Sequence, residues 1–156
     1  MAAEVGKPAP DFTLAGIDDT DAGRRDYSLA EYRGQVVVLV FYPGDNTTVC
    51  TRQLNSYTED IDSFTEAGAQ VLAVSPQSVT SHEDFSCKQG GFAFPLLADT
   101  DKAVGEAYGI LGPLGFYRRS AFVIDGAGVV RYAHRAVAGI TFRSTDELVK
   151  AVKAAS

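Results

Sequence analysis

Cys50 is the residue in this sequence whose position most strongly indicates chemistry. It follows the apolar run 36–41, which is typical of a buried strand, and lies at the start of a segment with helical spacing that begins near Val49. Unpaired backbone N–H groups and the positive end of the helix dipole meet at such a position, and both favour a thiolate over a thiol. A thiolate held there is a candidate nucleophile.

Each polar or conformationally special residue around this cysteine also has a purely structural interpretation. Cys50 alone is explained as well by burial, because free cysteine packs as a small hydrophobic residue. Pro43 and Asp45 are common in turns after a strand, and Thr47 can serve only as the N-cap of the helix. Arg119, much later in the chain, can pair with one of the many carboxylates.

Length and composition indicate one domain, residues 1–156, without a polyanionic partner. The chain has 156 residues, of which 46% are apolar, enough to fill a single core. Fourteen Lys and Arg against 20 Asp and Glu give a net charge of -6 and an isoelectric point near 4.8. Nucleic acids and anionic membranes bind concentrated basic surfaces, so neither is expected as a partner.

The sequence also predicts a cytoplasmic location. Its apolar runs are all shorter than a bilayer crossing requires, and residues 1–8 lack the apolar region of a secretory signal. Two cysteines are too few for a disulfide scaffold, which agrees with a reducing compartment.

Apolar runs and helix signals alternate along the chain. The first helix after the 36–41 strand is predicted to run from near Val49 to Gly68. The alternating strand and helix signals predict a layered α/β domain with a mixed sheet and helices on both faces. Further strands are predicted at 11–14, 70–75, 94–98 (as the start or edge of a strand, because of Pro95), 120–124 and 129–134, with a turn or hairpin tip at 16–23. Further helices are predicted at 29–32 after Ser28, from a capping box at Thr80 to Gly90, from Asp99 to Tyr108, and after a capping box at Ser144.

Two other cysteine chemistries are not supported. A dithiol oxidoreductase needs Cys-x-x-Cys, and Gln53 occupies the second position. A zinc site would need close pairs of ligands, and Cys50, Cys87, His82 and His134 are spread along the chain. We interpret His82 as a surface helix residue and His134 as a strand residue, and no metal, haem or flavin is implied.

The residues Pro43, Thr47 and Cys50, in the order Pro-x-x-x-Thr-x-x-Cys, resemble the motif of the peroxiredoxins, thiol peroxidases with a thioredoxin-like fold. Arg119, directly before a predicted strand, strengthens the resemblance. Within the family the chain is most similar to the Q-type, or bacterioferritin-comigratory-protein, group. The resemblance spans nearly the whole chain, because segments 6–14 and 94–99 also look like family segments.

The resemblance implies a role for each of these residues. Cys50 would attack a peroxide oxygen, forming a sulfenic acid and releasing water or an alcohol. The Thr47 hydroxyl, the Arg119 guanidinium and backbone N–H groups would stabilise the charge that moves onto the leaving oxygen. Pro43, which lacks an N–H, would shape the pocket and shield the sulfur. The position relative to the strand favours Arg119 over Arg118.

The resemblance leaves two roles open for the second cysteine. Many Q-type members have a resolving cysteine five residues after the first, where this chain has Asn55. One role for Cys87 is that of the resolving cysteine, which forms a disulfide with Cys50. A disulfide requires the two Cα atoms within about 7 Å, so the helix turn around Cys50, the helix of Cys87 or both would unwind locally. Gly90 and Gly91 would make that helix end easy to unwind. Alternatively Cys87 is structural, and an outside thiol reduces Cys50 directly.

The expected substrates are hydrogen peroxide and organic hydroperoxides. The reductant implied by the resemblance is thioredoxin or a similar small dithiol protein, and the expected state is a monomer, with a dimer as the alternative. A rival function of another class is a non-enzymatic redox sensor that passes oxidation to a partner.

Overall fold

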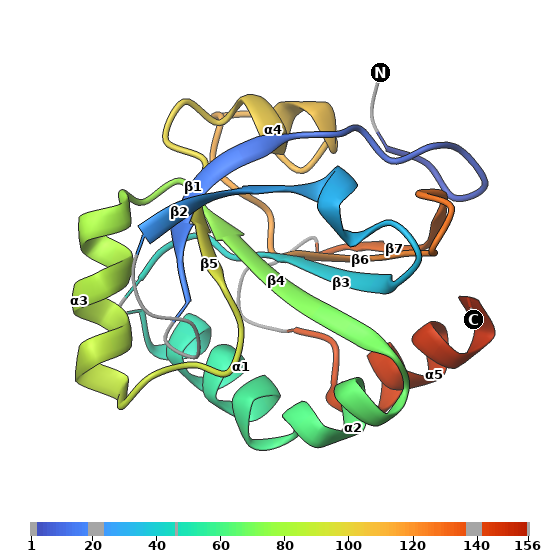
Figure 1. Cartoon of the computed structure of the whole chain (residues 1–156). Coiled ribbons are helices and arrows are strands. Elements are labelled where there is room, and N and C mark those ends of the chain that lie inside the picture. The colour runs from blue at the N-terminus through green and yellow to red at the C-terminus, as the bar shows by residue number, and fades with distance from the viewer. Residues whose placement is uncertain (1–2, 19–23, 46, 137–141, 156) are drawn as a thin grey trace.

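Within the part of the chain that the structure describes, seven strands form one mixed sheet in the order β2-β1-β5-β4-β3-β6-β7 (Figure 1). The structure is a computed structural model that describes residues 3–18, 24–45, 47–136 and 142–155. Strand β3 is parallel to β4, and β4 to β5, whereas the other neighbouring strands are antiparallel. The strands are β1 (Thr13–Ile17), β2 (Arg24–Ser28), β3 (Val36–Phe41), β4 (Ala69–Ser75), β5 (Leu96–Ala98), β6 (Ser120–Ile124) and β7 (Val130–Arg135).

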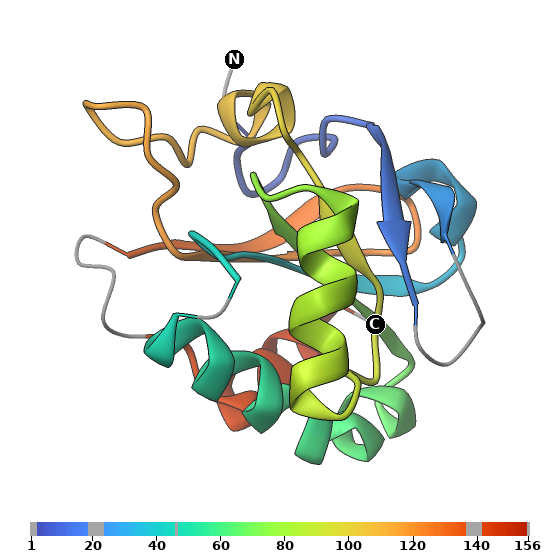
Figure 2. The ribbon, with the colours of Figure 1, turned by 90° about the vertical axis from the view of Figure 1, so that its left-hand side faces the viewer.

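Helices cover both faces of this sheet. Figures 1 and 2 agree in placing α1, α2 and α5 below the sheet and α4 above it, while α3 packs against β1 and β5. Within the described ranges, no helix combines the length and apolar character that a membrane crossing needs. The helices are the 3₁₀ helix η1 (Leu29–Tyr32) and the α-helices α1 (Thr48–Glu59), α2 (Ile61–Glu66), α3 (Val79–Gln89), α4 (Ala103–Ala107) and α5 (Thr145–Ala155).

Strand β3 divides the interior into two cores. Alternate side chains of a strand point to opposite faces, and here both faces are covered, so all six residues of β3 are buried. Val38 and Val40 pack with Leu54 of α1 on one face. Leu39 and Phe41 pack on the other face, with residues of α4 and the N-terminal segment. The apolar run of the sequence is thus the central strand, and the predicted mixed α/β architecture is confirmed.

The predicted single helix from near Val49 to Gly68 is wrong, because the structure breaks it at Asp60 into α1 and α2. The backbone of Asp60 (φ −99°, ψ 17°) leaves the helical region, and its N–H closes α1 on the carbonyl of Ser56. Aspartate favours such breaks because its carboxylate competes for backbone hydrogen bonds. The apolar face continues across the break, and Phe64 of α2 is fully buried.

The start of α3 also differs from the prediction. A capping box at Thr80 is expected, whereas the helix begins at Val79 and its N-cap is Ser78. The Ser78 hydroxyl accepts the N–H of Ser81 at 3.1 Å, the usual role of a serine at this position. The predicted end is confirmed, because Gly90 closes α3 in the left-handed region at φ 79°.

Helix α4 is shorter than the predicted segment from Asp99 to Tyr108. It begins after Lys102, whose φ is 62°, so Asp99 lies outside the helix. The buried Asp99 carboxylate nevertheless accepts the N–H groups of Val104 and Gly105, at 3.1 and 2.8 Å. Asp99 thus provides acceptors for backbone N–H groups in the first turn of α4, although it is not part of the helix.

The first strand is shifted towards the C-terminus from its predicted place at 11–14, and part of the predicted turn 16–23 belongs to it. Gly16 pairs with Leu97 of β5, and a Cβ there would meet the Leu96 carbonyl oxygen at 2.6 Å, so this close pairing requires glycine. Residues 19–23 of the predicted turn lie outside the described residues. Strand β5 starts just after Pro95, as predicted, but it is an inner strand rather than an edge.

The caps predicted for the first and last helical segments have different outcomes. Ser28 precedes η1, but its hydroxyl makes a hydrogen bond with that of Thr13, not with the helix. Ser144 does act as predicted, because its hydroxyl accepts the N–H of Glu147 at the start of α5. The predicted hairpin also forms, as β6 and β7.

Candidate active site

The sheet brings the predicted reactive cysteine and arginine to the same place. Strand β3 ends at Phe41, the chain crosses a short loop, and Cys50 lies in the first turn of α1. Phe41 pairs with Ser120 at the start of the antiparallel strand β6. Arg119 therefore stands directly beyond the end of β3, beside the loop that leads to Cys50.

The guanidinium of Arg119 contacts the sulfur. Its Nη1 lies 3.2 Å from Sγ of Cys50 and donates a second hydrogen bond of 2.6 Å to Oε1 of Gln53, one turn along α1. Arg119 is only 3% exposed and Cys50 is fully buried. A cation held this close to a buried sulfur stabilises negative charge on it.

A chain of hydrogen bonds fixes Gln53 from its other side. Its Nε2 donates to the Tyr57 hydroxyl at 3.4 Å, and that hydroxyl donates to the carbonyl oxygen of Arg143 at 2.6 Å. Burial raises the pKa of Tyr57 to about 12, so the phenol keeps its proton at neutral pH. The amide oxygen of Gln53 is thereby held facing Arg119, which fixes the direction of the guanidinium.

Thr47 occupies the N-cap of α1. Its Oγ1 accepts the N–H of Cys50 at 3.3 Å and lies 3.4 Å from the carbonyl oxygen of Gly44, to which it donates. The residue is exposed, whereas Pro43 in the same loop is half-buried. The structure shows the capping role of Thr47 and places its hydroxyl next to Cys50.

The alternative arginine lies elsewhere. Arg118 directs its guanidinium to the carbonyl oxygens of Ala136 and Arg135, at 3.0 and 3.4 Å. These contacts join the loop before β6 to the end of β7. Adjacent residues at the start of a strand point to opposite sides, which is why Arg119 reaches the cysteine and Arg118 does not.

Cys87 lies in a different environment. It is in the last turn of α3, its side chain is exposed, and both cysteines are free thiols. It lines a shallow surface groove with Glu83, Ser86 and the two glycines that follow the helix. The Asn55 amide donates to Oε1 of Gln89 at 3.1 Å, so α3 is tied to α1 close to Cys87.

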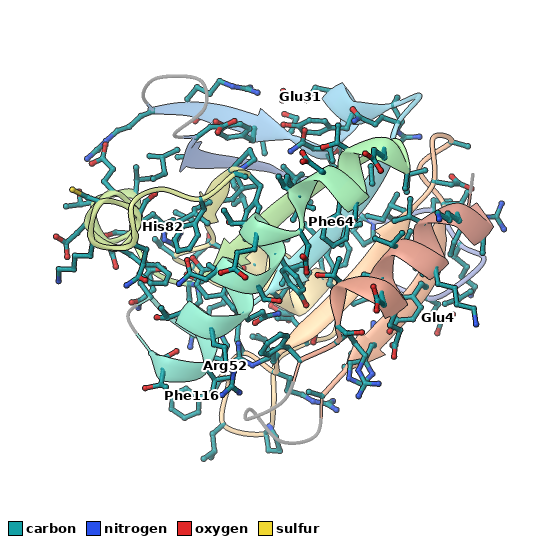
Figure 3. All side chains as sticks on the ribbon, turned by 90° about the horizontal axis from the view of Figure 1, so that it is seen from below. Glu4, Glu31, Arg52, Phe64, His82 and Phe116 are labelled. Atoms are coloured by element: carbon teal, nitrogen blue, oxygen red, sulfur yellow. The ribbon has the colours of Figure 1, made fainter. Side chains whose placement is uncertain are left out.

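The interpretation of His82 as a surface residue is wrong, because its side chain is fully buried on the inner side of α3 (Figure 3). Its Nδ1 lies 2.8 Å from Oδ2 of Asp45, and its Nε2 lies 2.9 Å from the carbonyl oxygen of Leu97. The spacing to Phe85, also buried, was the available signal, since residues three apart share a helix face. His134 lies in β7, as predicted.

Comparison with known proteins assigns the chain to a family. The AhpC/TSA family model matches residues 5–133. The thioredoxin peroxidase of Echinococcus granulosus is 40% identical over 138 residues, which are 84% of this chain and 70% of that protein. Peroxiredoxin-2 of Rattus norvegicus is 37% identical over 159 residues, which are 97% of this chain and 79% of that protein.

Solved structures agree with these relatives. The reduced 2-Cys peroxiredoxin of Plasmodium vivax superposes with a TM-score of 0.87 at 27% identity, covering 96% of this chain and 94% of that one. The thioredoxin-like fold implied by the sequence resemblance is therefore confirmed. Since the family match covers most of the sequence and two relatives exceed 30% identity, the chain belongs to the AhpC/TSA family and is a peroxiredoxin, an enzyme of the peroxidase class.

Proposed function

We propose that Cys50 is the nucleophile with which this enzyme reduces hydrogen peroxide and organic hydroperoxides. The observation that carries the proposal is the 3.2 Å contact between Nη1 of Arg119 and Sγ of Cys50. A buried arginine directed at a sulfur, whose same nitrogen also donates to an amide oxygen, is arranged to hold negative charge on that sulfur.

In the first step the Cys50 thiolate attacks the terminal oxygen of the hydroperoxide. An S–O bond forms, the O–O bond breaks, and its electron pair leaves on the second oxygen, which takes a proton to become water or an alcohol. The sulfur is oxidised to a sulfenic acid, and the peroxide is reduced by two electrons.

Arg119 and Thr47 would stabilise the oxygen that accumulates charge in this step. Gln53 fixes Arg119 before the reaction, and the capping contact with Cys50 fixes the Thr47 oxygen, whose hydrogen would turn from the Gly44 carbonyl oxygen to the substrate. Preorganised donors act most strongly in water-poor sites, where each contributes roughly 2.7–4 kcal/mol to lowering the barrier. Pro43 would complete the pocket wall, because it has no N–H to compete for the sulfur.

The burial of Cys50 defines how a substrate would approach. The sulfur is fully buried, while Thr47 beside it is exposed and Pro43 is half-buried. We place the entry for peroxide between these two residues. A peroxide group is small, so a modest displacement of the loop admits it, whereas bulky thiol reagents need a larger opening.

Cys87 would resolve the sulfenic acid. Its thiol condenses with the Cys50 sulfenic acid, an S–S bond replaces the S–O bond, and water leaves. Because Cys50 is buried and Cys87 is exposed, the first turn of α1, the end of α3 or both would unwind for the sulfurs to meet. The left-handed Gly90 and Gly91 after α3 favour unwinding there.

The same observation, an exposed Cys87 and a buried Cys50, supports a second candidate, a one-cysteine cycle. An outside thiol would then reduce the Cys50 sulfenic acid directly, and Cys87 would take no part. This cycle and the disulfide cycle share the first step and differ only in how the sulfenic acid is removed.

The disulfide would be reduced by thioredoxin or a similar dithiol protein, in two exchanges that leave the reductant oxidised. The name of the Echinococcus granulosus relative, a thioredoxin peroxidase, supports this choice. We further propose a single catalytic domain over residues 1–156, a Q-type subgroup, a cytoplasmic location, a monomer or else a dimer, and no nucleic-acid or membrane partner.

Intact mass after one equivalent of hydrogen peroxide tests this function. The disulfide cycle predicts loss of two hydrogens in the wild type and gain of one oxygen in Cys87→Ser. A stable gain of one oxygen in the wild type would establish the one-cysteine cycle instead. An unchanged mass of Cys87→Ser would overturn the proposal that Cys50 reacts with peroxide.

A further inference from the structure

A buried polar cluster joins the loop before Cys50 to helix α3. The carboxylate of Asp45, in that loop, accepts hydrogen bonds from the Tyr42 hydroxyl at 2.8 Å and the Ser81 hydroxyl at 2.7 Å. Nδ1 of His82 lies 2.8 Å from the same carboxylate. Tyr42 and His82 are fully buried, and Asp45 is 7% exposed. The peroxidase step described above uses none of these side chains.

The surroundings of His82 determine what each ring nitrogen does. Nε2 faces the carbonyl oxygen of Leu97, which can only accept, so Nε2 carries a hydrogen. Nδ1 faces the Asp45 carboxylate, which also accepts a hydrogen from the Tyr42 hydroxyl. Burial, and then the charge of Asp45, raise the pKa of Tyr42 well above its usual value, so this phenol remains a donor. The Tyr42 hydroxyl also lies 3.4 Å from Nδ1 of His82, so Tyr42, Asp45 and His82 form one connected cluster.

Asp45 is close in sequence to two groups of the proposed site. It lies two residues after Pro43 and two before Thr47, whose hydroxyl contacts the amide of Cys50. A short loop with its middle residue fixed has little freedom at either end. Fixing Asp45 therefore also limits where Thr47 can place its hydroxyl.

The contacts of His82 serve two separable purposes. The bond from Nε2 to Leu97 joins α3 to β5 and contributes to docking the helix. The contact from Nδ1 joins α3 to the loop before Cys50. A residue with a purely structural role would need the first contact, whereas a residue that positions the loop would need the second.

We propose that His82 and Asp45 are positioning residues of the peroxidase reaction, acting through the loop that carries Pro43 and Thr47. The buried contact between Nδ1 and the carboxylate holds this loop where the Thr47 hydroxyl faces Cys50, so its loss slows the attack on peroxide. This inference rests on the proposed role of Cys50 as the nucleophile.

Two substitutions of His82 separate the contacts. In His82→Asn the amide nitrogen takes the place of Nδ1 and keeps the donor to Asp45, but it cannot reach Leu97. In His82→Gln the amide nitrogen takes the place of Nε2 and keeps the bond to Leu97, but the contact between residue 82 and Asp45 is lost, while Tyr42 and Ser81 still donate to Asp45. A small displacement of a catalytic group costs up to about 10²-fold in rate.

The experiment is rapid quenching with hydrogen peroxide in the Cys87→Ser background, with the sulfenic acid at Cys50 followed by intact mass. We expect His82→Gln to lower the second-order rate constant by about 10- to 100-fold and His82→Asn to change it by less than about threefold. Asp84→Asn, which breaks an exposed pair with Lys88 on the same helix, is the matched control and stays within about twofold.

The outcomes separate this inference from the function on which it rests. Equal rate constants for the Asn and Gln variants, or a slower Asn variant, would overturn the positioning role and leave the nucleophile intact. No oxidation in the parent Cys87→Ser protein would overturn the function itself. If circular dichroism shows His82→Gln to be unfolded, Asp45→Asn takes its place, with the same expected loss of rate and an unchanged rate as the contrary result.

Discussion

The two cysteines of this enzyme occupy opposite kinds of helix end. Cys50 lies in the first turn of α1, fully buried, with an arginine nitrogen 3.2 Å from its sulfur. Cys87 lies in the last turn of α3, exposed, beside a groove that includes Glu83. Negative charge is stabilised at the amino end of a helix and destabilised at the carboxyl end. The two cysteines therefore differ both in the charge that surrounds the sulfur and in the access of solvent to it.

The comparison teaches how the two steps of the proposed cycle place different demands on a thiol. Attack on peroxide needs fixed charge and fixed donors, which only a buried, hydrogen-bonded site provides. Condensation with a sulfenic acid needs a thiol that can move to its partner, which favours an exposed helix end followed by glycines. The differences between the two sites therefore make separate predictions for each step.

Substitution of the buried cysteine should have the largest effect. Cys50→Ser replaces the sulfur with an oxygen that cannot form a sulfenic acid, so peroxide consumption with any thiol reductant should fall to the uncatalysed rate. A coupled peroxidase assay measures this, with Cys87→Ser as the control that keeps the first step. Substantial turnover in Cys50→Ser would show that the exposed thiol is the nucleophile, reversing the comparison.

Removal of the cation should be nearly as severe. Arg119→Met keeps the volume of the side chain but loses the donor to Cys50, and the second-order rate constant with hydrogen peroxide should fall by roughly 10²- to 10³-fold. Arg118→Met is the matched control, because the Arg118 guanidinium contacts only backbone carbonyls in the hydrogen bonds described above. Equal losses in both variants would mean that general charge, not contact with the sulfur, matters.

The hydroxyl of Thr47 should matter less than the cation and should be replaceable. Thr47→Val removes both the cap and the donor, and we expect a loss of roughly 10- to 100-fold, since a hydrogen bond to a charged group contributes about 1.5–3 kcal/mol. Thr47→Ser keeps the hydroxyl and should retain most of the rate. A Val variant as active as the Ser variant would leave Thr47 with its capping role alone, visible as a lower free energy of unfolding.

Thiol labelling compares the two sites directly in the reduced native protein. N-ethylmaleimide is bulkier than a peroxide group. It should modify the exposed Cys87 at least about 10-fold faster than the buried Cys50, because labelling of Cys50 must wait for local opening of the structure. Single-cysteine variants identify which sulfur reacts, and intact mass follows both rates. Faster labelling of Cys50 would mean that its pocket is more open than the structure shows.

Much of this arrangement follows from local sequence patterns. The run 36–41 is entirely apolar because both faces of β3 are covered, and a buried strand followed by a helix signal is readable without the structure. The order of Pro43, Thr47 and Cys50 is likewise local. Arg119 was found through its place before a predicted strand, although it lies 69 residues from the cysteine it contacts.

The remaining contacts were not predictable because they join distant segments. Asp45 and His82 are 37 residues apart, and the bond from Tyr57 to Arg143 spans 86 residues. Aspartate is common in turns after a strand, whether its side chain is exposed or buried. The sequence therefore does not indicate that Asp45 is buried. The burial of His82 could be read from its spacing to Phe85, but its partner Asp45 on a distant loop could not.

The smallest expected effect concerns stability, and it tests whether the exposed cysteine is free of structural duties. Cys87→Ser should change the free energy of unfolding by less than about 0.5 kcal/mol, the usual range for surface substitutions. Phe85→Ala, two residues earlier on the buried face of α3, should cost about 3–5 kcal/mol because its ring packs against Phe92. Urea unfolding at neutral pH measures both. If Cys87→Ser approached the cost of Phe85→Ala, Cys87 would be a packing residue, and the one-cysteine cycle would become the better account of the enzyme.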